Sequence, residues 1–323
     1  MKKILRIIIF FAIGIGFIWW FLAKLSSQEI NQLLSSFSKA NYYWFFVAIL
    51  INLLSSLIRA IRWQQLIKPM GYNPKLMPTF LSVMCGYLAN LAVPRLGEIV
   101  RCGILHKNQK VPFEKAIGTV IIERAVDMLL FLIILLIALS LEFNFIKDYL
   151  YTNFSHIFDF SQLKYYLLYA FIGIIAIALV LHLFRKQIRQ TKIYNKIKGL
   201  IIGLLEGIKS ILKLKNPLLF IFNSLFIWFL WILGTYVIFL CLPETSNLTF
   251  KIAVIATVLS AVGPMVTPGG IGIFPAIIAE TLLIYGIIKP IGYAIGWLLW
   301  IVSQIGSVVV GLFGFGYFSY KDK

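Results

Sequence analysis

Apolar runs about as long as a lipid bilayer is thick recur along this 323-residue chain, and clusters of lysine and arginine separate them. A helix that crosses the hydrocarbon core needs roughly 20 mostly apolar residues. Charged residues make up 13% of the chain, whereas about 25% is usual for a soluble domain. The sequence therefore predicts an all-α fold, a polytopic bundle of transmembrane helices that forms one membrane domain over residues 1–323.

The positions of the apolar runs predict the individual helices. Uninterrupted helices are expected at 7–23, 43–66, 116–140, 165–184, 217–242 and 291–318. A broken helix is expected at 76–93, and half-helices at 252–262 and 276–288 are each too short to cross the membrane. Residues 185–215 combine many bases with apolar residues at helical spacing, which predicts a basic amphipathic segment on the cytosolic membrane surface.

The stretch Asn90–Arg101 reads NLAVPRLGEIVR and interrupts the first broken element. Irregular backbone persists in a bilayer only where it is buried in protein or lines a wet cavity, and ionisable side chains at that depth are functional candidates. The candidates here are Asn90, Pro94, Arg95, Gly97, Glu98 and Arg101. The alternative interpretation is an ordinary cytosolic loop that leaves the membrane at Pro94.

A second interruption, Gly263–Gly272, lies between the two half-helices and is rich in proline and glycine. We expect an unwound turn within the membrane, with Pro275 at the first position of the second half-helix. The candidate site residues are Pro268, Gly269, Gly270, Gly272 and, further along the chain, Glu280. The alternative is an outer loop that joins two ordinary short helices.

Two arginines lie near the end of the helix expected at 43–66. Arg59 and Arg62 are three residues apart and so share one helix face. We expect them to bind a lipid phosphate, because a guanidinium can bind phosphate in bidentate fashion. The alternative is that both side chains extend to the anionic headgroups at the membrane surface.

The helix expected at 116–140 carries Glu123, Arg124 and Asp127, of which the two acids share a face. A charge that faces lipid costs on the order of 2.5–3.5 kcal/mol at the centre of a helix. These side chains are therefore expected to face the bundle interior, where Arg95 or Arg101 would pair with the carboxylates and Glu280 could help to balance the bases. A purely structural ion pair is the alternative.

The distribution of bases predicts how the chain crosses the membrane. The basic clusters fall on one side if each interrupted element begins and ends on the same side. The N-terminus and the C-terminus are then cytoplasmic, and the two interrupted elements enter from opposite faces, as in transporters with inverted repeats. We expect a multi-pass protein of a bacterial cytoplasmic (inner) membrane.

Charge and cysteine usage argue against other classes of protein. The net charge is +18, but the bases lie between apolar runs and not along one polar face, so no nucleic-acid partner is expected. Cys85, Cys102 and Cys241 lack the spacing of a metal or redox site. No cofactor, metal or catalytic residue is expected, because the sequence holds no recognisable motif for one.

Four motifs occur in a characteristic order: RAIRW (Arg59–Trp63), NLAVPRLGEIVR (Asn90–Arg101), ERAVD (Glu123–Asp127) and PGGIGIF (Pro268–Phe274). Together they resemble the flippase-like membrane family typified by the transmembrane region of lysylphosphatidylglycerol synthase. The resemblance implies that the membrane region translocates lipids. Larger members add a cytosolic domain that transfers lysine or alanine from tRNA to phosphatidylglycerol. No such domain is recognised here, so aminoacyl transfer is not expected.

One position departs from the family pattern. An acid often follows GGIGIF in the family, whereas this sequence has Pro275. If that acid takes part in coupling, Glu280 would have to replace it.

These observations predict a non-enzymatic lipid translocase that binds the headgroup of an anionic or modified phospholipid. An anionic phospholipid or a lipid-linked sugar is the expected partner. One alternative is a membrane enzyme that uses Glu98, Glu123 or Asp127 as acid or base on a lipid-linked substrate. Another is a non-catalytic scaffold that docks a separate lipid-modifying enzyme through residues 185–215.

Overall fold

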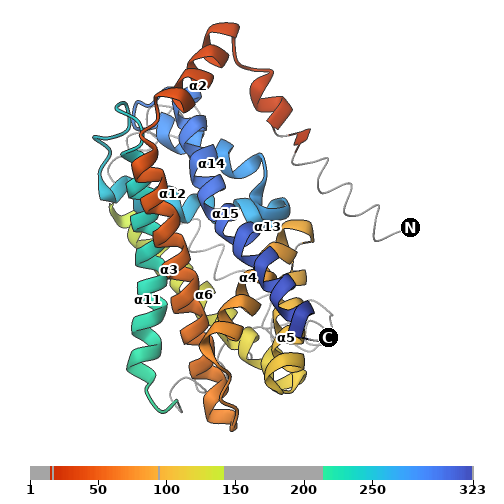
Figure 1. The fold of residues 1–323 in the computed structure, drawn as a ribbon. Helices are drawn as coiled ribbons and strands as arrows, with labels where there is room; N and C mark the ends of the chain where they lie inside the picture. The colour runs from red at the N-terminus through yellow and green to blue at the C-terminus, as the bar shows by residue number, and fades with distance from the viewer. Residues whose placement is uncertain (1–14, 17, 94, 142–213, 322–323) are drawn as a thin grey trace, which may run out of the picture.

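A computed structural model describes residues 15–16, 18–93, 95–141 and 214–321 (Figure 1). These residues form helices and contain no strand. By length and composition, three of the described helices could cross a membrane: Tyr42–Met70, Pro217–Phe239 and Lys289–Tyr320. The predicted all-α membrane bundle is therefore confirmed.

The long helices are α3 (Tyr42–Ile67), α6 (Phe113–Leu141), α11 (Pro217–Phe239) and α15 (Lys289–Lys321). The shorter helices are α2 (Ser27–Lys39), α4 (Leu76–Ala92), α5 (Leu96–Gln109), α12 (Phe250–Ser260), α13 (Gly263–Val266) and α14 (Ile273–Leu283), with 3₁₀ turns η1 (Lys68–Met70) and η3 (Pro268–Gly270). Helices α2 and α5 occupy segments where the apolar pattern predicts none. Three predicted segments lie wholly or largely outside the described residues. They are the helix at 165–184, the basic segment 185–215 and the helix at 7–23.

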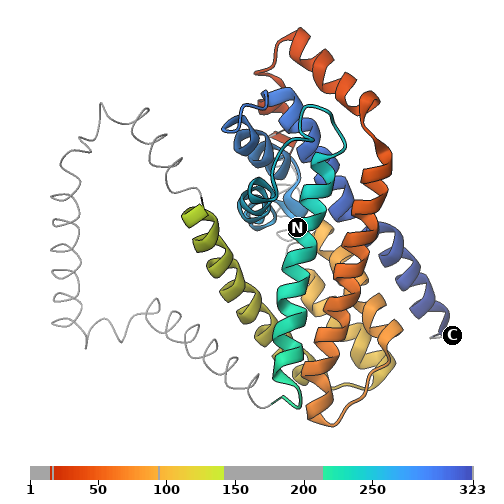
Figure 2. The same cartoon turned by 90° about the vertical axis from the view of Figure 1, so that its left-hand side faces the viewer.

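Helices α3 and α11 run antiparallel, side by side (Figures 1 and 2). The side chain of Asn41 caps α3 by accepting a hydrogen bond of 3.1 Å from the backbone N–H of Tyr43. Helix α11 begins at Pro217, a position where the missing N–H of proline costs no intrahelical bond. The outer faces of both helices expose large apolar side chains such as Phe46 and Phe222. Such surfaces suit contact with lipid.

Helix α15 packs against both interrupted elements, one along each half of its length (Figure 1). A Cβ atom on Gly296 would lie 2.6 Å from the Cα of Pro275 in α14. A Cβ atom on Gly311 would lie 2.9 Å from the carbonyl oxygen of Met84 in α4. Since α15 is one continuous helix, the two elements enter the bundle from opposite ends, as the charge pattern predicts.

The tips of the two interrupted elements meet near the middle of α15. A Cβ atom on Gly269 would lie 2.5 Å from Cδ2 of Leu91, in the last turn of α4. The indole Nε1 of Trp300 in α15 donates a hydrogen bond of 2.8 Å to the carbonyl oxygen of Gly269. The turn of the second element is thus largely buried against α4 and α15, which satisfies the condition for irregular backbone within a membrane. In the turn of the first element, Ala92 and Arg95 are exposed.

The turn of the second element depends on glycine. Gly269, Gly270 and Gly272 have φ values of 58°, 76° and 76°, in the left-handed region that favours glycine. The sequence predicts Pro275 at the first position of the second half-helix. Helix α14 instead begins at Ile273, directly after Gly272, so Pro275 occupies its third position. Proline is tolerated there because N–H groups of the first turn have no intrahelical partner to lose.

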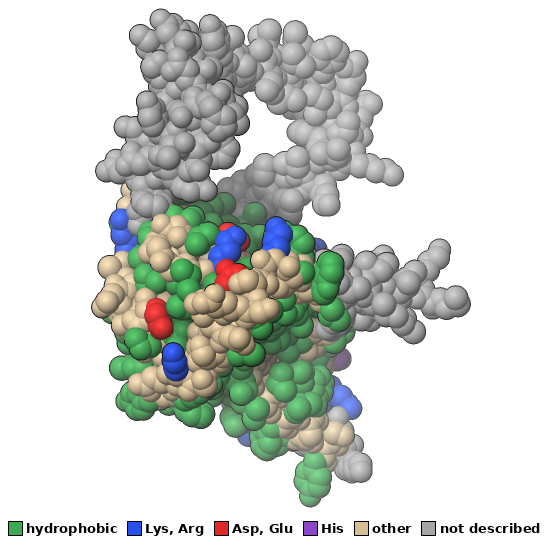
Figure 3. Space-filling view, turned by 90° about the horizontal axis from the view of Figure 1, so that it is seen from above, with side chains coloured by type: hydrophobic (Ala, Val, Ile, Leu, Met, Phe, Trp, Pro, Cys, Tyr) green, Lys and Arg blue, Asp and Glu red, His purple; other side chains and the backbone are tan. Residues whose placement is uncertain are grey.

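The two ends of the bundle differ in charge. Among the described side chains, the end at which α3 ends and α6 begins carries six lysines and one acid: Lys68, Lys75, Lys107, Lys110, Lys115, Lys215 and Glu114. The opposite end carries both signs in similar number: Lys24, Lys39, Lys251, Lys289, Glu29, Glu244 and Glu280. Viewed from this second end, basic and acidic side chains lie near one another on the surface (Figure 3). Among the described residues, the excess of positive charge at the surface is therefore much larger at the first end than at the second.

Candidate functional site

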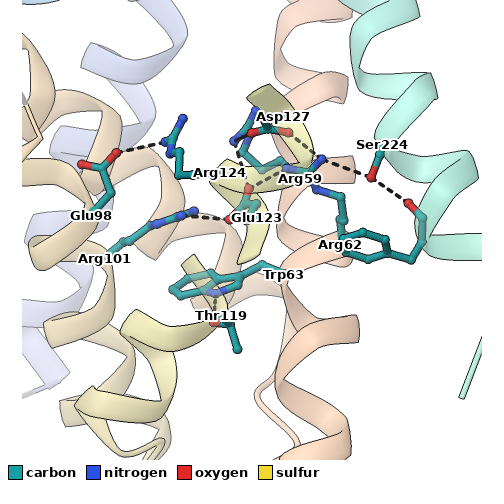
Figure 4. A network of polar contacts seen from close by, with 11 residues as sticks. Arg59, Arg62, Trp63, Glu98, Arg101, Thr119, Glu123, Arg124, Asp127 and Ser224 are labelled. Carbon is teal, nitrogen blue, oxygen red and sulfur yellow. Dashed lines mark hydrogen bonds and ion pairs between the residues drawn. The ribbon is translucent and has the colours of Figure 1, made fainter. Parts of the chain in front are cut away.

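Five charged side chains gather where α3, α5 and α6 meet, and we call them the arginine cluster: Arg59, Arg62, Arg101, Glu123 and Asp127 (Figure 4). Glu123 lies at the centre. Its Oε1 is 2.9 Å from Nη1 of Arg59 and 2.9 Å from Nη2 of Arg62, and its Oε2 is 2.8 Å from Nη2 of Arg101. Asp127 adds ion pairs of 3.1 Å to Arg59 and 2.8 Å to Arg62. One carboxylate thus binds guanidiniums from two different helices.

Helical spacing explains why these side chains converge. Arg59 and Arg62 project from one face of α3, and Glu123 and Asp127 project from one face of α6, so that two pairs meet across the helix interface. Arg101 reaches Glu123 from α5, which is the third helix at this junction. The expected partnership between Arg101 and the acids is therefore present.

The arginine cluster is buried in the bundle. The exposed fraction of the side chain is 2% for Arg59 and 0% for both Arg62 and Glu123. Arg59 and Arg62 therefore do not extend to the membrane surface. This excludes the alternative that their side chains contact the anionic headgroups there. Burial of so many charges is tolerable only because each one is paired, since an isolated buried charge costs several kcal/mol.

The charges in the cluster do not balance. Three guanidiniums face two carboxylates, which leaves an excess of one positive charge. In addition, the Nε atoms of Arg59, Arg62 and Arg101 are buried without a hydrogen-bond partner among the described residues. Excess positive charge together with free N–H donors favours an additional anion at this site.

Three neighbouring side chains hold the arginines in position. The guanidinium of Arg101 lies over the ring of Trp63, 4.7 Å from its centroid, and the Trp63 Nε1 donates a hydrogen bond of 2.9 Å to Oγ1 of Thr119. The Oγ of Ser224 in α11 accepts a hydrogen bond of 3.2 Å from Nη1 of Arg62. Sequence reasoning did not identify these contacts. Trp63 directly follows Arg62, but nothing in the sequence marks Thr119 or Ser224.

A small pocket lies beside the cluster, between α4, α5 and α6. Its lining consists of Val83, Gly86, Tyr87, Asn90, Gly97, Glu98, Arg101 and Arg124. Five of these residues are site candidates from the sequence, whereas Val83, Gly86 and Tyr87 are not. Arg101 belongs both to this pocket and to the arginine cluster.

Polar contacts organise the wall of the pocket. The Oδ1 of Asn90 accepts a hydrogen bond of 2.7 Å from the backbone N–H of Gly97. Oε1 of Glu98 lies 3.1 Å from Nη2 of Arg124, and their side chains are 22% and 45% exposed. The pocket therefore combines a partly accessible ion pair with the buried guanidinium of Arg101.

Arg95 does not join the cluster. It is exposed, has a φ of 67° and occupies the turn directly before α5. The expected pairing of Arg95 with Glu123 or Asp127 is therefore wrong, because the turn directs this side chain outward and Arg101, further into α5, takes the place instead. Pro94 lies outside the described residues.

The candidates of the second interrupted element lie apart from the arginine cluster. Pro268 and Gly270 are buried in the turn that meets the first element, beside Gly269 and Gly272. Glu280 is exposed and pairs with Lys289 at 2.8 Å. The expectation that Glu280 balances the arginines is therefore not met, since its carboxylate already has a basic partner on the surface.

The paired carboxylates are poorly suited to acid–base chemistry. Glu123 contacts three guanidiniums and Asp127 contacts two. Every oxygen atom of the two carboxylates is therefore held by at least one guanidinium. No oxygen atom of either acid is free to exchange a proton with a substrate.

Two curated archaeal proteins are similar to this chain over nearly their full length. UPF0104 membrane protein PH1989 of Pyrococcus horikoshii is 25% identical over 341 residues, which cover 96% of this chain and 97% of the relative. UPF0104 membrane protein MJ1595 of Methanocaldococcus jannaschii is 25% identical over 331 residues, with 96% and 94% covered. No solved structure matches the chain significantly.

The resemblance carried by the four sequence motifs extends well beyond them. Residues 5–311 match the family described as "Lysylphosphatidylglycerol synthase TM region". This match includes the whole arginine cluster, the pocket and both interrupted elements. The chain therefore belongs to the lysylphosphatidylglycerol synthase transmembrane-region family of membrane proteins.

Proposed function

We propose that this protein moves the headgroup of an anionic phospholipid between the two leaflets of a membrane. The observation that carries the proposal is the position of Arg101. Its guanidinium lines the partly accessible pocket and also pairs with Glu123 in the buried cluster. A headgroup bound in the pocket would therefore contact the charge network that occupies the bundle interior.

The electrostatics of the interior support an anionic cargo. The excess of one positive charge in the cluster is costly in a medium of low dielectric constant, and an anion would lower that cost. Arginine is suited to the role because its planar guanidinium binds phosphate oxygens in bidentate fashion. The acyl chains would remain in hydrocarbon while the headgroup follows the polar residues.

The architecture supports movement through the middle of the membrane. Two interrupted helical elements that enter from opposite ends and meet at their tips are a common arrangement in secondary transporters, whose substrate sites lie near the midplane. In this chain the tips meet at Leu91 and Gly269, and the pocket lies on the first element. Rocking of one element against the other would expose the pocket to each side in turn.

The charge difference between the two ends supports a specific orientation. The lysine-rich end, which includes Lys68 and Lys115, is proposed to face the cytoplasm, because cytoplasmic connections are enriched in lysine and arginine. The C-terminal end of α15 lies at this same end of the bundle (Figure 1). A bacterial cytoplasmic membrane is the proposed location.

Lipid movement in proteoliposomes tests the role of Arg101. Fluorescent phosphatidylglycerol is placed in both leaflets, and its loss of signal to a membrane-impermeant quencher is followed over time. We expect wild type to move the lipid and Arg101→Gln to lose about tenfold or more in rate, because a charge-assisted hydrogen bond is worth roughly 1.5–3 kcal/mol. Lys75→Gln removes the same charge from an exposed position and should behave as wild type.

A structural effect of Arg101→Gln is recognised by its elution profile and its thermal midpoint in detergent. Arg101→Lys provides a second variant that keeps the charge and loses the planar fork. Equal rates for wild type, Arg101→Gln and Arg101→Lys would overturn the proposal.

A further inference from the structure

We infer that Glu98 competes with the lipid headgroup for binding to Arg124. Its carboxylate forms an ion pair with Arg124 until the phosphodiester of a lipid displaces it. The inference deepens the proposed function and rests on the binding of an anion in the same pocket. It names the ligand class, a compact phosphodiester, and the residue that regulates access.

The contacts of Glu98 are those of a carboxylate that is easily displaced. Its Oε1 has one ion-pair partner, Nη2 of Arg124 at 3.1 Å. Its Oε2 is buried and has no hydrogen-bond partner among the described residues. Glu123, in contrast, binds three guanidiniums and is buried completely. Of these two acids, only Glu98 can leave its partner at a modest cost.

Arg124 is accessible to an incoming ligand. Its side chain is 45% exposed, whereas the side chain of Arg101 on the same pocket is 4% exposed. A ligand therefore meets Arg124 first and has Arg101 behind it. The two guanidiniums would bind one phosphate from two sides once Glu98 has moved.

Charge and size favour a phosphodiester as the replacing group. A phosphodiester carries one negative charge and two free oxygen atoms, as the carboxylate of Glu98 does, so it can form with Arg124 the same ion pair that this carboxylate forms. The pocket is narrow because α4 and α5 approach each other at Gly86 and Gly97. A phosphate group is smaller than a sugar and would require less widening of this site. Exchange of one anion for another also avoids very tight binding, which would hinder release.

Binding of a soluble short-chain lipid tests the inference directly. The probe is dihexanoyl phosphatidylglycerol, titrated calorimetrically into the full-length protein in detergent. We expect Glu98→Gln to lower the Kd roughly two- to fivefold, the range that corresponds to loss of a partly exposed competing ion pair. Glu114→Gln removes an exposed acid from the first turn of α6 as a matched charge change and should leave the Kd at the wild-type value.

A double variant shows whether the gain acts through Arg124. Arg124→Gln should weaken binding, and adding Glu98→Gln to it should give no further gain, since the competing pair no longer exists. An unchanged or higher Kd in Glu98→Gln, or a full gain in the Arg124→Gln background, would overturn the inference. Tighter binding by Glu98→Gln in a protein that moves no lipid would support this inference and overturn the proposed function.

Discussion

At the scale of single residues, Glu123 has the most connected position in the described part of the molecule. Its two oxygen atoms contact three guanidiniums from α3 and α5, and its side chain is fully buried. Removing one partner from a buried ion-pair network destabilises a protein by more than the network's net contribution to stability. The reason is that the remaining charges stay buried without a partner.

Glu123→Gln should therefore destabilise the protein by about 3–5 kcal/mol. The amide keeps the shape of the side chain, but Arg59 and Arg62 would then have Asp127 as their remaining carboxylate and Arg101 would lose its ion pair. The measurement is the midpoint of unfolding in detergent by heat or by a denaturing surfactant. Glu114→Gln is the control, because this exposed acid lies outside the cluster. Equal midpoints for Glu123→Gln and the control would contradict the assignment of Glu123 as the centre of the network.

Sequence reasoning predicted the buried charges better than their partners. The spacing of Arg59 with Arg62, and of Glu123 with Asp127, predicted shared faces, and the cost of a charge that faces lipid predicted that the two acids point inward. For the two arginines, sequence reasoning left both the inward and the headgroup-facing orientation open. It could not choose between Arg95 and Arg101, since that choice depends on the left-handed turn at Arg95 that sends its side chain outward. Contacts between distant segments, such as Arg62 with Ser224, leave no periodic signal.

At the scale of the elements, the α4–α5 hairpin depends on close backbone packing. A Cβ atom on Gly97 would clash with the carbonyl oxygen of Gly86 and would lie 2.7 Å from the side-chain amide of Asn90. These atoms form one wall of the pocket. The small residues thus set the separation of α4 and α5 and, with it, the shape of the site.

Gly97→Ala should destabilise the protein by about 1–3 kcal/mol, the usual cost of overpacking, and should weaken binding of dihexanoyl phosphatidylglycerol. Gly103→Ala is the matched control on the same helix, because a Cβ atom there meets nothing within 4 Å. Alanine has the higher helix propensity, so the control should be unchanged or more stable by up to about 1 kcal/mol. A thermal midpoint of Gly97→Ala at or above that of Gly103→Ala would contradict this account of the hairpin.

Interruptions of the apolar pattern predicted both broken elements. The helix boundaries within these elements were harder to predict from the sequence. Helix α5 was missed because Leu96–Gln109 mixes apolar and polar residues in equal number and lacks a side-chain cap at its start. The start of α14 was displaced to Ile273 because Gly272 allows the chain to turn before Pro275. In both cases tertiary packing fixes a helix boundary that local preference leaves open.

At the scale of the whole molecule, the two interrupted elements share α15 as a common support. Glycines along α15 let the first element pack on its second half and the second element pack on its first half. Apolar exposed faces surround this core, and the excess of lysine lies at one end. The interior of the bundle therefore combines a positively charged site with a meeting point of two unwound turns.

The most direct measurement of the central claim is headgroup selectivity in vesicles. Purified wild type is reconstituted, and the movement of fluorescent phosphatidylglycerol is compared with that of fluorescent phosphatidylcholine in otherwise identical vesicles. An interior with one excess positive charge predicts faster movement of the anionic lipid than of the zwitterionic one, with protein-free vesicles moving neither. Equal movement of the two lipids, or no movement of phosphatidylglycerol above the protein-free rate, would contradict the claim that this site selects and carries an anionic headgroup.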